Sequence, residues 1–134
     1  MIAFEQFQIR DGSPIYMQIV DFVERGIAGG IIEDGDELPS RRMLSALLSV
    51  NPNTVQKAYR ILEERGIIES RSGAKSCVTA DGAVTEKIRT RLLASDLTAV
   101  VQNMKQMRID RDTALRLLGA AWDQSEEGEG GIDL

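Results

Sequence analysis

Apolar residues recur at every third or fourth position in three stretches of the first half of the chain, the spacing of amphipathic helices. The first helix is predicted to follow the turn at residues 11–13, with Ser13 as its cap and Pro14 at the first helical position. Gly29 and Gly30 are expected to end it. Its expected buried face consists of Ile15, Ile19, Phe22, Val23 and Ile27.

Two more helices follow, separated by only a few residues. Ser40 is the expected cap of the second helix, and Asn51 followed by Pro52 begins a third that runs to about Arg65. So short a connection makes the two helices cross sharply, which is the geometry of a helix-turn-helix. The expected buried residues are Met43, Leu44, Leu47 and Leu48 in the second helix and Val55, Ala58, Tyr59 and Leu62 in the third.

The pattern changes on either side of these helices. Residues 2–9 are expected to form either a short strand or a packed arm, and residues 31–39 a turn between the first two helices. Residues 67–79 predict two short strands around a turn. Three helices followed by a β-hairpin is the order of a winged helix, so we expect a mainly α fold with a small β-hairpin. We place this winged helix-turn-helix domain at residues 1–80.

Residues 81–124 carry two further helical patterns, and residues 125–134 are expected to be a frayed, Gly- and Glu-rich tail. The five-residue step from Leu92 to Leu97 marks a candidate kink in the first of these helices. Two apolar stripes after a small domain would stay in contact with water in a monomer, so we expect this region to form a homodimer. The expected dimer-interface residues are Ile88, Leu92, Leu97, Val101, Met104, Leu115, Leu118 and Trp122.

Composition narrows the chemistry of the chain. It has 134 residues, one cysteine and no histidine. The lack of histidine excludes Ser-His triads and the usual zinc sites, so we expect no enzyme activity, no cofactor and no bound metal. Cys77 has no partner for an internal disulfide, and neither a membrane-spanning run nor a secretory signal is visible. We therefore expect a cytoplasmic protein without membrane contact.

The net charge of −5 argues against a nucleic-acid partner, but its distribution reverses that argument. Residues 38–78 hold seven basic and three acidic side chains, a net charge of +4, between flanking segments of −6 and −3. A basic middle between acidic ends indicates a localised anionic partner, although a plain solvated face gives the same pattern. The acidic ends should weaken binding to DNA of arbitrary sequence.

The outward face of the third helix carries the residues best suited to contact DNA. Asparagine and glutamine can pair with the N6 and N7 atoms of adenine, and lysine can reach guanine or a phosphate. The positive end of the helix dipole also favours phosphate. The residues on this face are Asn53, Thr54, Gln56, Lys57 and Arg60.

Several motifs in register resemble the GntR family of bacterial transcription regulators, whose winged helix carries a leucine-proline-serine-x-arginine signature before its recognition helix. Here that signature is Leu38-Pro39-Ser40-Arg41-Arg42. The run from Asn51 to Tyr59 (NPNTVQKAY) and the run from Ser13 to Ile19 (SPIYMQI) are similar to the YtrA-type subfamily. The short remainder after residue 80 also fits this subfamily.

The resemblance implies roles for particular residues. Arg42 matches an arginine that contacts DNA, and Gly73 matches the glycine at the tip of the wing that enters the minor groove. The wing departs from the family pattern, because Lys75 and Cys77 replace a second glycine and an aromatic residue. The expected DNA-contacting residues are Ser40, Arg41, Arg42, Asn51, Asn53, Thr54, Gln56, Lys57, Arg60, Arg71, Gly73 and Lys75.

Two functional hypotheses follow. The first is a homodimeric transcription regulator, expected to be a repressor, that binds double-stranded DNA at an inverted-repeat operator through residues 52–65 and the wing at 67–79. The second is a winged-helix module that docks a protein without specific DNA binding. We also allow for a small-molecule effector that the sequence does not identify.

Overall fold

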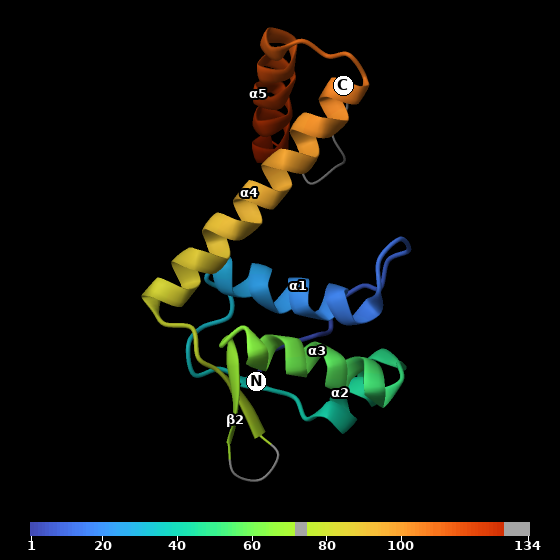
Figure 1. The fold of residues 1–134 in the computed structure, drawn as a ribbon, viewed down its shortest axis with the longest axis vertical. Coiled ribbons are helices and arrows are strands. Elements are labelled where there is room, and N and C mark those ends of the chain that lie inside the picture. Colours follow the sequence, from blue (N-terminus) through green and yellow to red (C-terminus); the bar gives the residue numbers. More distant parts are fainter. Residues whose placement is uncertain (72–74, 128–134) are drawn as a thin grey trace. The chain divides into compact units, whose positions relative to one another are not determined.

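The computed structural model describes residues 1–71 and 75–127, and the chain divides into two compact units, Met1–Leu92 and Leu93–Leu134. The first unit contains α1 (Ile15–Ala28), β1 (Glu37–Leu38), α2 (Arg41–Leu48), α3 (Pro52–Glu64), β2 (Ile68–Arg71) and β3 (Lys75–Val78) (Figure 1). Helix α4 (Gly82–Gln106) begins in the first unit and continues into the second, where α5 (Arg111–Glu127) follows it. The predicted winged-helix order is confirmed.

The sheet has one strand more than the sequence predicts. β1, β3 and β2 lie in that order and are antiparallel, with Leu38 opposite Ser76, and Ser70 also opposite Ser76. Residues 31–39 therefore do not form only a turn, because Glu37–Leu38 joins the edge of the hairpin. A strand of two residues is too short to show an alternating pattern, and it exists through pairing with residues about forty positions away.

The core of the first unit lies between α1, α3 and the inner face of the sheet. Helices α1 and α3 lie side by side (Figure 1). Residues 2–9 form a packed arm and not a strand: Ile2 and Phe4 are buried, and the Ile2 amide donates to the Glu37 carbonyl at 2.8 Å. Phe4 and Phe7 pack against Phe22 of α1, with ring centroids 5.0 and 5.4 Å from that of Phe22; the Phe7 contact is edge-to-face.

Two of the three predicted helix caps are confirmed. The Ser40 hydroxyl accepts from the Met43 amide at 3.1 Å, and the Asn51 side chain accepts from the Asn53 amide at 2.8 Å. The prediction for Ser13 is wrong, because the cap residue of α1 is Pro14, which has no side-chain hydrogen bond to offer. Backbone geometry alone starts that helix: the Pro14 carbonyl accepts from the amides of Met17 and Gln18.

Helix α2 buries a narrower face than its periodicity predicts. Leu44 is fully buried, but Met43 and Leu47 are 51% and 52% exposed. The helix has eight residues and packs mainly against α3, so only the side chains on one narrow face of the helix are buried. Met43 and Leu47 lie beside this buried face, where α2 is open to solvent.

The first part of α4 belongs to the first unit, which extends to Leu92. Ile88 and Leu92 are only 4% and 9% exposed because they pack in the core of the first unit, so they are not free to form a dimer interface. Glu24 of α1, itself 1% exposed, pairs with both Arg65 and Arg91. This buried carboxylate ties the end of α3 and the start of α4 to α1.

The described part of the second unit has no core of its own. None of residues 93–126 is buried, and α4 runs through the step from Leu92 to Leu97 without a break. Helix α5 starts at a cap formed by Asp110, whose carboxylate accepts from the Thr113 amide and hydroxyl; the hydroxyl bond is the larger cause of its lowered pKa. The helix extends to Glu127, beyond the predicted start of the tail, and residues 128–134 of that tail lie outside the described residues.

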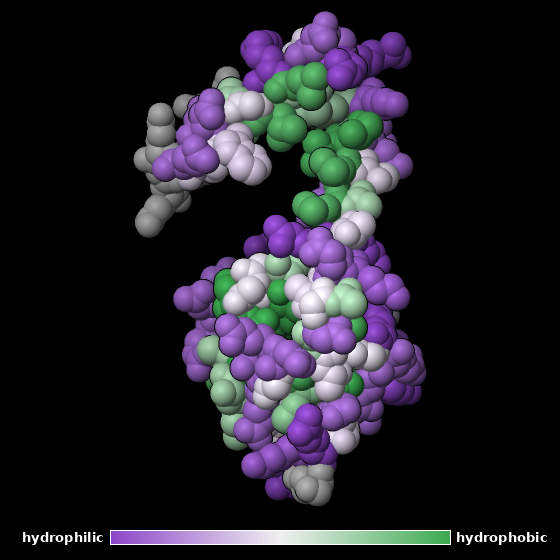
Figure 2. All heavy atoms as spheres, turned by 90° about the vertical axis from the view of Figure 1, so that its left-hand side faces the viewer, coloured by the Kyte–Doolittle hydropathy of each residue, from purple (hydrophilic) through white to green (hydrophobic). Residues whose placement is uncertain are grey.

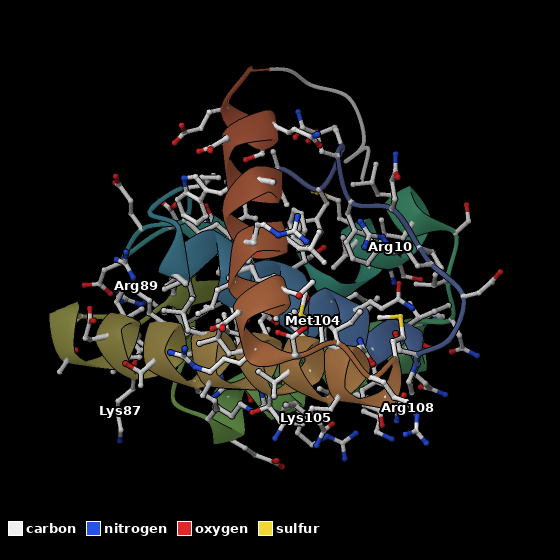
Figure 3. The ribbon with its side chains drawn as sticks, turned by 90° about the horizontal axis from the view of Figure 1, so that it is seen from above. Arg10, Lys87, Arg89, Met104, Lys105 and Arg108 are labelled. Carbon is white, nitrogen blue, oxygen red and sulfur yellow. The ribbon has the colours of Figure 1, made fainter. Side chains whose placement is uncertain are left out.

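Large apolar side chains gather on one side of these two helices (Figure 2). Met104 is half-buried, and Lys105 and Arg108 project to a different side of the chain from it (Figure 3). The predicted interface residues that are exposed here are Leu97, Val101, Leu115, Leu118 and Trp122. Trp122 is 66% exposed, and its indole N–H donates to the Glu126 carboxylate.

A strained residue in the turn between α2 and α3 gives a stability test. Ser49 caps the end of α2 with φ 55° and ψ 45°, a left-handed conformation that costs a non-glycine residue roughly 1–2 kcal/mol. We expect Ser49→Gly to raise the free energy of unfolding by about 0.5–1 kcal/mol, after part of the gain is lost to the greater freedom of unfolded glycine. Urea unfolding followed by circular dichroism measures this change.

Ser49→Val is the matched control, since a β-branched residue is least tolerant of positive φ and should destabilise the protein. An unfolding midpoint for Ser49→Gly at or below that of the wild type would contradict the assignment of strain to this turn.

Candidate nucleic-acid interface

Helix α3 has two sharply different faces. Val55, Ala58, Tyr59 and Leu62 are fully buried against the rest of the first unit, as predicted. The opposite face exposes Asn53, Gln56, Lys57 and Arg60, and Thr54 is half-buried at its edge. Burial of the apolar face of α3 therefore determines which of its side chains point to solvent. Those side chains are the polar residues that the sequence predicts to contact DNA.

The start of α3 presents a positive helix end with no acidic residue in its first turn. Pro52 occupies the first turn, and the oxygen of the Asn51 side chain is engaged in the cap. Ser40 is similarly engaged at the start of α2. Both capping residues are exposed.

The two neighbouring arginines of α2 differ in their surroundings. Arg42 is exposed and, within the described residues, has no carboxylate at ion-pair distance. Arg41 contacts its own protein: its Nη2 atom lies 3.1 Å from Oε1 of Glu63, and its guanidinium lies 5.2 Å from the centroid of the Tyr59 ring. The Nε atom of Arg41 is buried and has no hydrogen-bond partner among the described residues. The structure therefore gives Arg41 a role inside the fold that the sequence does not reveal.

Glu63 connects this arginine to the wing. Its Oε1 atom also accepts from the hydroxyl of Ser70 on β2 at 2.8 Å. Tyr59 adds a further link, donating its hydroxyl to the Pro39 carbonyl at 2.6 Å. Burial raises the pKa of the Tyr59 phenol, and the charge of Arg41 offsets part of that rise. These contacts hold the start of α2, the end of α3 and the first wing strand together.

The wing carries its cations on the outer face of the sheet. Arg71 and Lys75 are opposite one another across β2 and β3, and each is paired with a carboxylate: Arg71 with Glu69 at 3.1 Å and Lys75 with Glu37 at 3.6 Å. All four side chains are substantially exposed, so these ion pairs are weak and can open toward a phosphate. Gly73, the predicted wing tip, lies outside the described residues.

Sequence reasoning missed the side chains that hold the predicted contact residues. Glu69 two positions before Arg71 on one strand face could have been paired from strand alternation alone. The partners Glu63 and Glu37 come from distant segments and leave no local signal. The sequence also does not predict the contact with Tyr16 of α1: the Nζ atom of Lys57 lies 4.0 Å from the centroid of the Tyr16 ring.

Residues 1–71 and 75–127 contain no group of three or more histidine, cysteine, aspartate or glutamate side chains arranged to hold a metal ion. Among the helices described, none has both the length and the apolar character needed to cross a membrane.

Comparisons with known proteins agree with this geometry. The family model described as bacterial regulatory proteins, gntR family, matches residues 15–78, which span α1 to β3. The HTH-type transcriptional repressor YtrA of Bacillus subtilis is 37% identical over 105 residues, covering 78% of this chain and 76% of that protein. The uncharacterized regulator YhcF of the same organism is 30% identical over 81% of this chain and 89% of its own length.

Solved structures show the same arrangement of elements. A GntR family transcriptional regulator from Listeria monocytogenes aligns with a TM-score of 0.75 and 32% identity, covering 83% of this chain and 97% of that one. YtrA from Sulfolobus acidocaldarius aligns with a TM-score of 0.53 and 34% identity, covering 69% and 99%. With its helix-turn-helix, its wing and relatives that match over most of their length, the chain belongs to the GntR family of DNA-binding transcription regulators, and not to a family of enzymes.

Proposed function

We propose that the protein is a homodimeric repressor that binds an inverted-repeat operator, reading bases with α3 and the adjacent minor groove with the wing. The observation that carries this proposal is the outward face of α3, where amide and cationic side chains stand exposed above a fully buried apolar stripe. The Bacillus subtilis relative YtrA, named a transcriptional repressor, supports the direction of regulation.

The exposed residues of α3 suit different features of DNA. Asn53 and Gln56 can each form two hydrogen bonds with an adenine edge in the major groove. Thr54 can place its methyl group against that of a thymine, and Lys57 and Arg60 can reach guanine or a phosphate. At the margins, Ser40, Arg42, Arg71 and Lys75 would position the protein by contacting the backbone.

The second unit supports the proposal of a dimer. None of residues 93–126 is buried, and seven large apolar side chains on α4 and α5 are more than two-fifths exposed. Contact with the same face of a second copy would remove this surface from water, and a two-fold axis would present two copies of α3 to two half-sites. The proposed interface residues are Leu97, Val101, Met104, Leu115, Leu118 and Trp122.

One observation favours the alternative of a protein-docking module. Met43 and Leu47 stand exposed one helical turn apart on α2 and could contact a protein partner. A mobility-shift titration with an operator duplex obtained by footprinting, against a duplex of shuffled sequence, separates the two functions. Specific binding favours the regulator, and equal binding to both duplexes would favour the docking module.

A substitution on α3 tests base reading. We expect Gln56→Ala to weaken binding to the operator by about 1–3 kcal/mol and to relax the preference at a single base pair, because one bidentate contact is lost. Fluorescence anisotropy with duplexes varied at each position measures both effects. Gln8→Ala, at an exposed glutamine of the arm, is the control and should bind like the wild type. A uniform loss over all base positions would contradict base reading by Gln56.

Substitutions of Arg41 and Arg42 of α2 should have different effects on the salt dependence of DNA affinity. Arg42→Ala should reduce the slope of log affinity against log salt by about 0.9, since one phosphate contact is lost, and should leave the unfolding midpoint unchanged. Arg41→Ala should lower the unfolding midpoint and leave the slope unchanged, because Arg41 pairs with Glu63. A reduced slope for Arg41→Ala at unchanged stability would instead make Arg41 a DNA contact.

The dimer can be tested by placing a charge on the apolar face of α4. Analytical ultracentrifugation should give a dimer for the wild type and a monomer for Leu97→Glu, since an unpaired carboxylate in an apolar interface is costly. Ser95→Glu introduces the same charge on the opposite side of α4 and should remain dimeric. A monomeric wild-type protein would refute the proposed assembly.

A further inference from the structure

We propose that Tyr16, which lies on the first turn of α1 and outside the helix-turn-helix, is a positioning residue that holds Lys57 ready for contact with DNA. The inference rests on the proposed function, in which the outer face of α3 meets the duplex. It adds α1 to the elements that determine how that face is presented.

The contact joins two helices whose relation is fixed by the core. Tyr16 is half-buried on α1, and Lys57 is exposed on α3, with its Nζ atom 4.0 Å from the centroid of the Tyr16 ring. Ile19 and Val23 of α1 and Ala58 of α3 are fully buried, so neither backbone is free to move relative to the other. The ring is therefore a fixed platform, and the lysine is the flexible partner that it orders.

Lys57 differs from several other basic residues of the first unit because it contacts an aromatic ring and, within the part of the chain that the structure describes, no carboxylate. Several other cations of the first unit are paired with carboxylates: Arg41 with Glu63, Arg71 with Glu69, Lys75 with Glu37, and both Arg65 and Arg91 with Glu24. Among the described residues, Lys57 has no carboxylate at ion-pair distance.

The two kinds of partner differ in what they leave for DNA. A carboxylate orders a cation but cancels its charge, so the ion pair must open before a phosphate can bind. An aromatic face attracts a cation through its quadrupole and carries no net charge, so the ammonium keeps its full charge. Lys57 is thus both ordered and unneutralised, which reduces the entropy lost on binding without weakening the attraction to DNA.

A double-mutant cycle tests the inference with the operator duplex as the probe. Lys57→Met should reduce the slope of log affinity against log salt by about 0.9. Tyr16→Leu should weaken operator binding about two- to five-fold, the range expected of one exposed cation–π contact. Tyr16→Phe, which keeps the aromatic face, should bind like the wild type. In the Lys57→Met background, Tyr16→Leu should have no further effect.

The outcomes separate this inference from the proposed function. An equal loss for Tyr16→Leu in both backgrounds would overturn the positioning role, and so would a loss for Tyr16→Phe as large as that for Tyr16→Leu. If Lys57→Met binds the operator like the wild type, both the inference and the assignment of Lys57 to the DNA surface fail. Equal wild-type affinity for operator and shuffled duplexes would refute the proposed function itself. The cycle cancels any general loss of stability, because that loss is common to both backgrounds.

Discussion

The exposed surface of the helix-turn-helix depends on the burial of one stripe of α3. Val55, Ala58, Tyr59 and Leu62 are fully buried, and removing a single buried leucine typically costs about 2–5 kcal/mol, a large part of the stability of a small domain. Because successive residues are about 100° apart around a helix, a rotation by one position would expose this stripe and bury polar amides. The core therefore sets the direction of every outward side chain on this helix.

Polar contacts determine how the helices and strands are oriented relative to one another. Apolar packing alone leaves this undetermined, because the hydrophobic effect has no preferred direction. Glu63 joins Arg41 to Ser70 and so relates the start of α2 to the wing. Glu24 joins Arg65 to Arg91 and so holds the start of α4. Buried or half-buried charges of this kind are costly to leave unpaired, and each pair therefore specifies the position of its elements. The exposed surfaces of α2, α3 and the wing are therefore held in position by these internal pairs.

Apolar residues recur with the same helical spacing in both halves of α4, but they are buried in the first half and exposed in the second. Ile88 and Leu92 lie in the core of the first unit, whereas Leu97 and Val101, which continue the pattern, are exposed. Periodicity reports that one side of a helix is apolar, but it does not report whether the covering surface is in the same chain. This is why the predicted interface includes Ile88 and Leu92, which are buried in the core of the first unit.

The sequence by itself determined the helices, their caps at Ser40 and Asn51, the hairpin, and the polar face of α3, because these features follow from interactions between residues a few positions apart. Only the tertiary structure decided that Glu37–Leu38 forms a strand, that Met43 and Leu47 stay exposed, and that Ile88 and Leu92 are core residues. It also decided which cations are neutralised and that Lys57 meets the ring of Tyr16. Each of these depends on contacts between segments far apart in the chain, and their pairing is set by the packing of the whole unit.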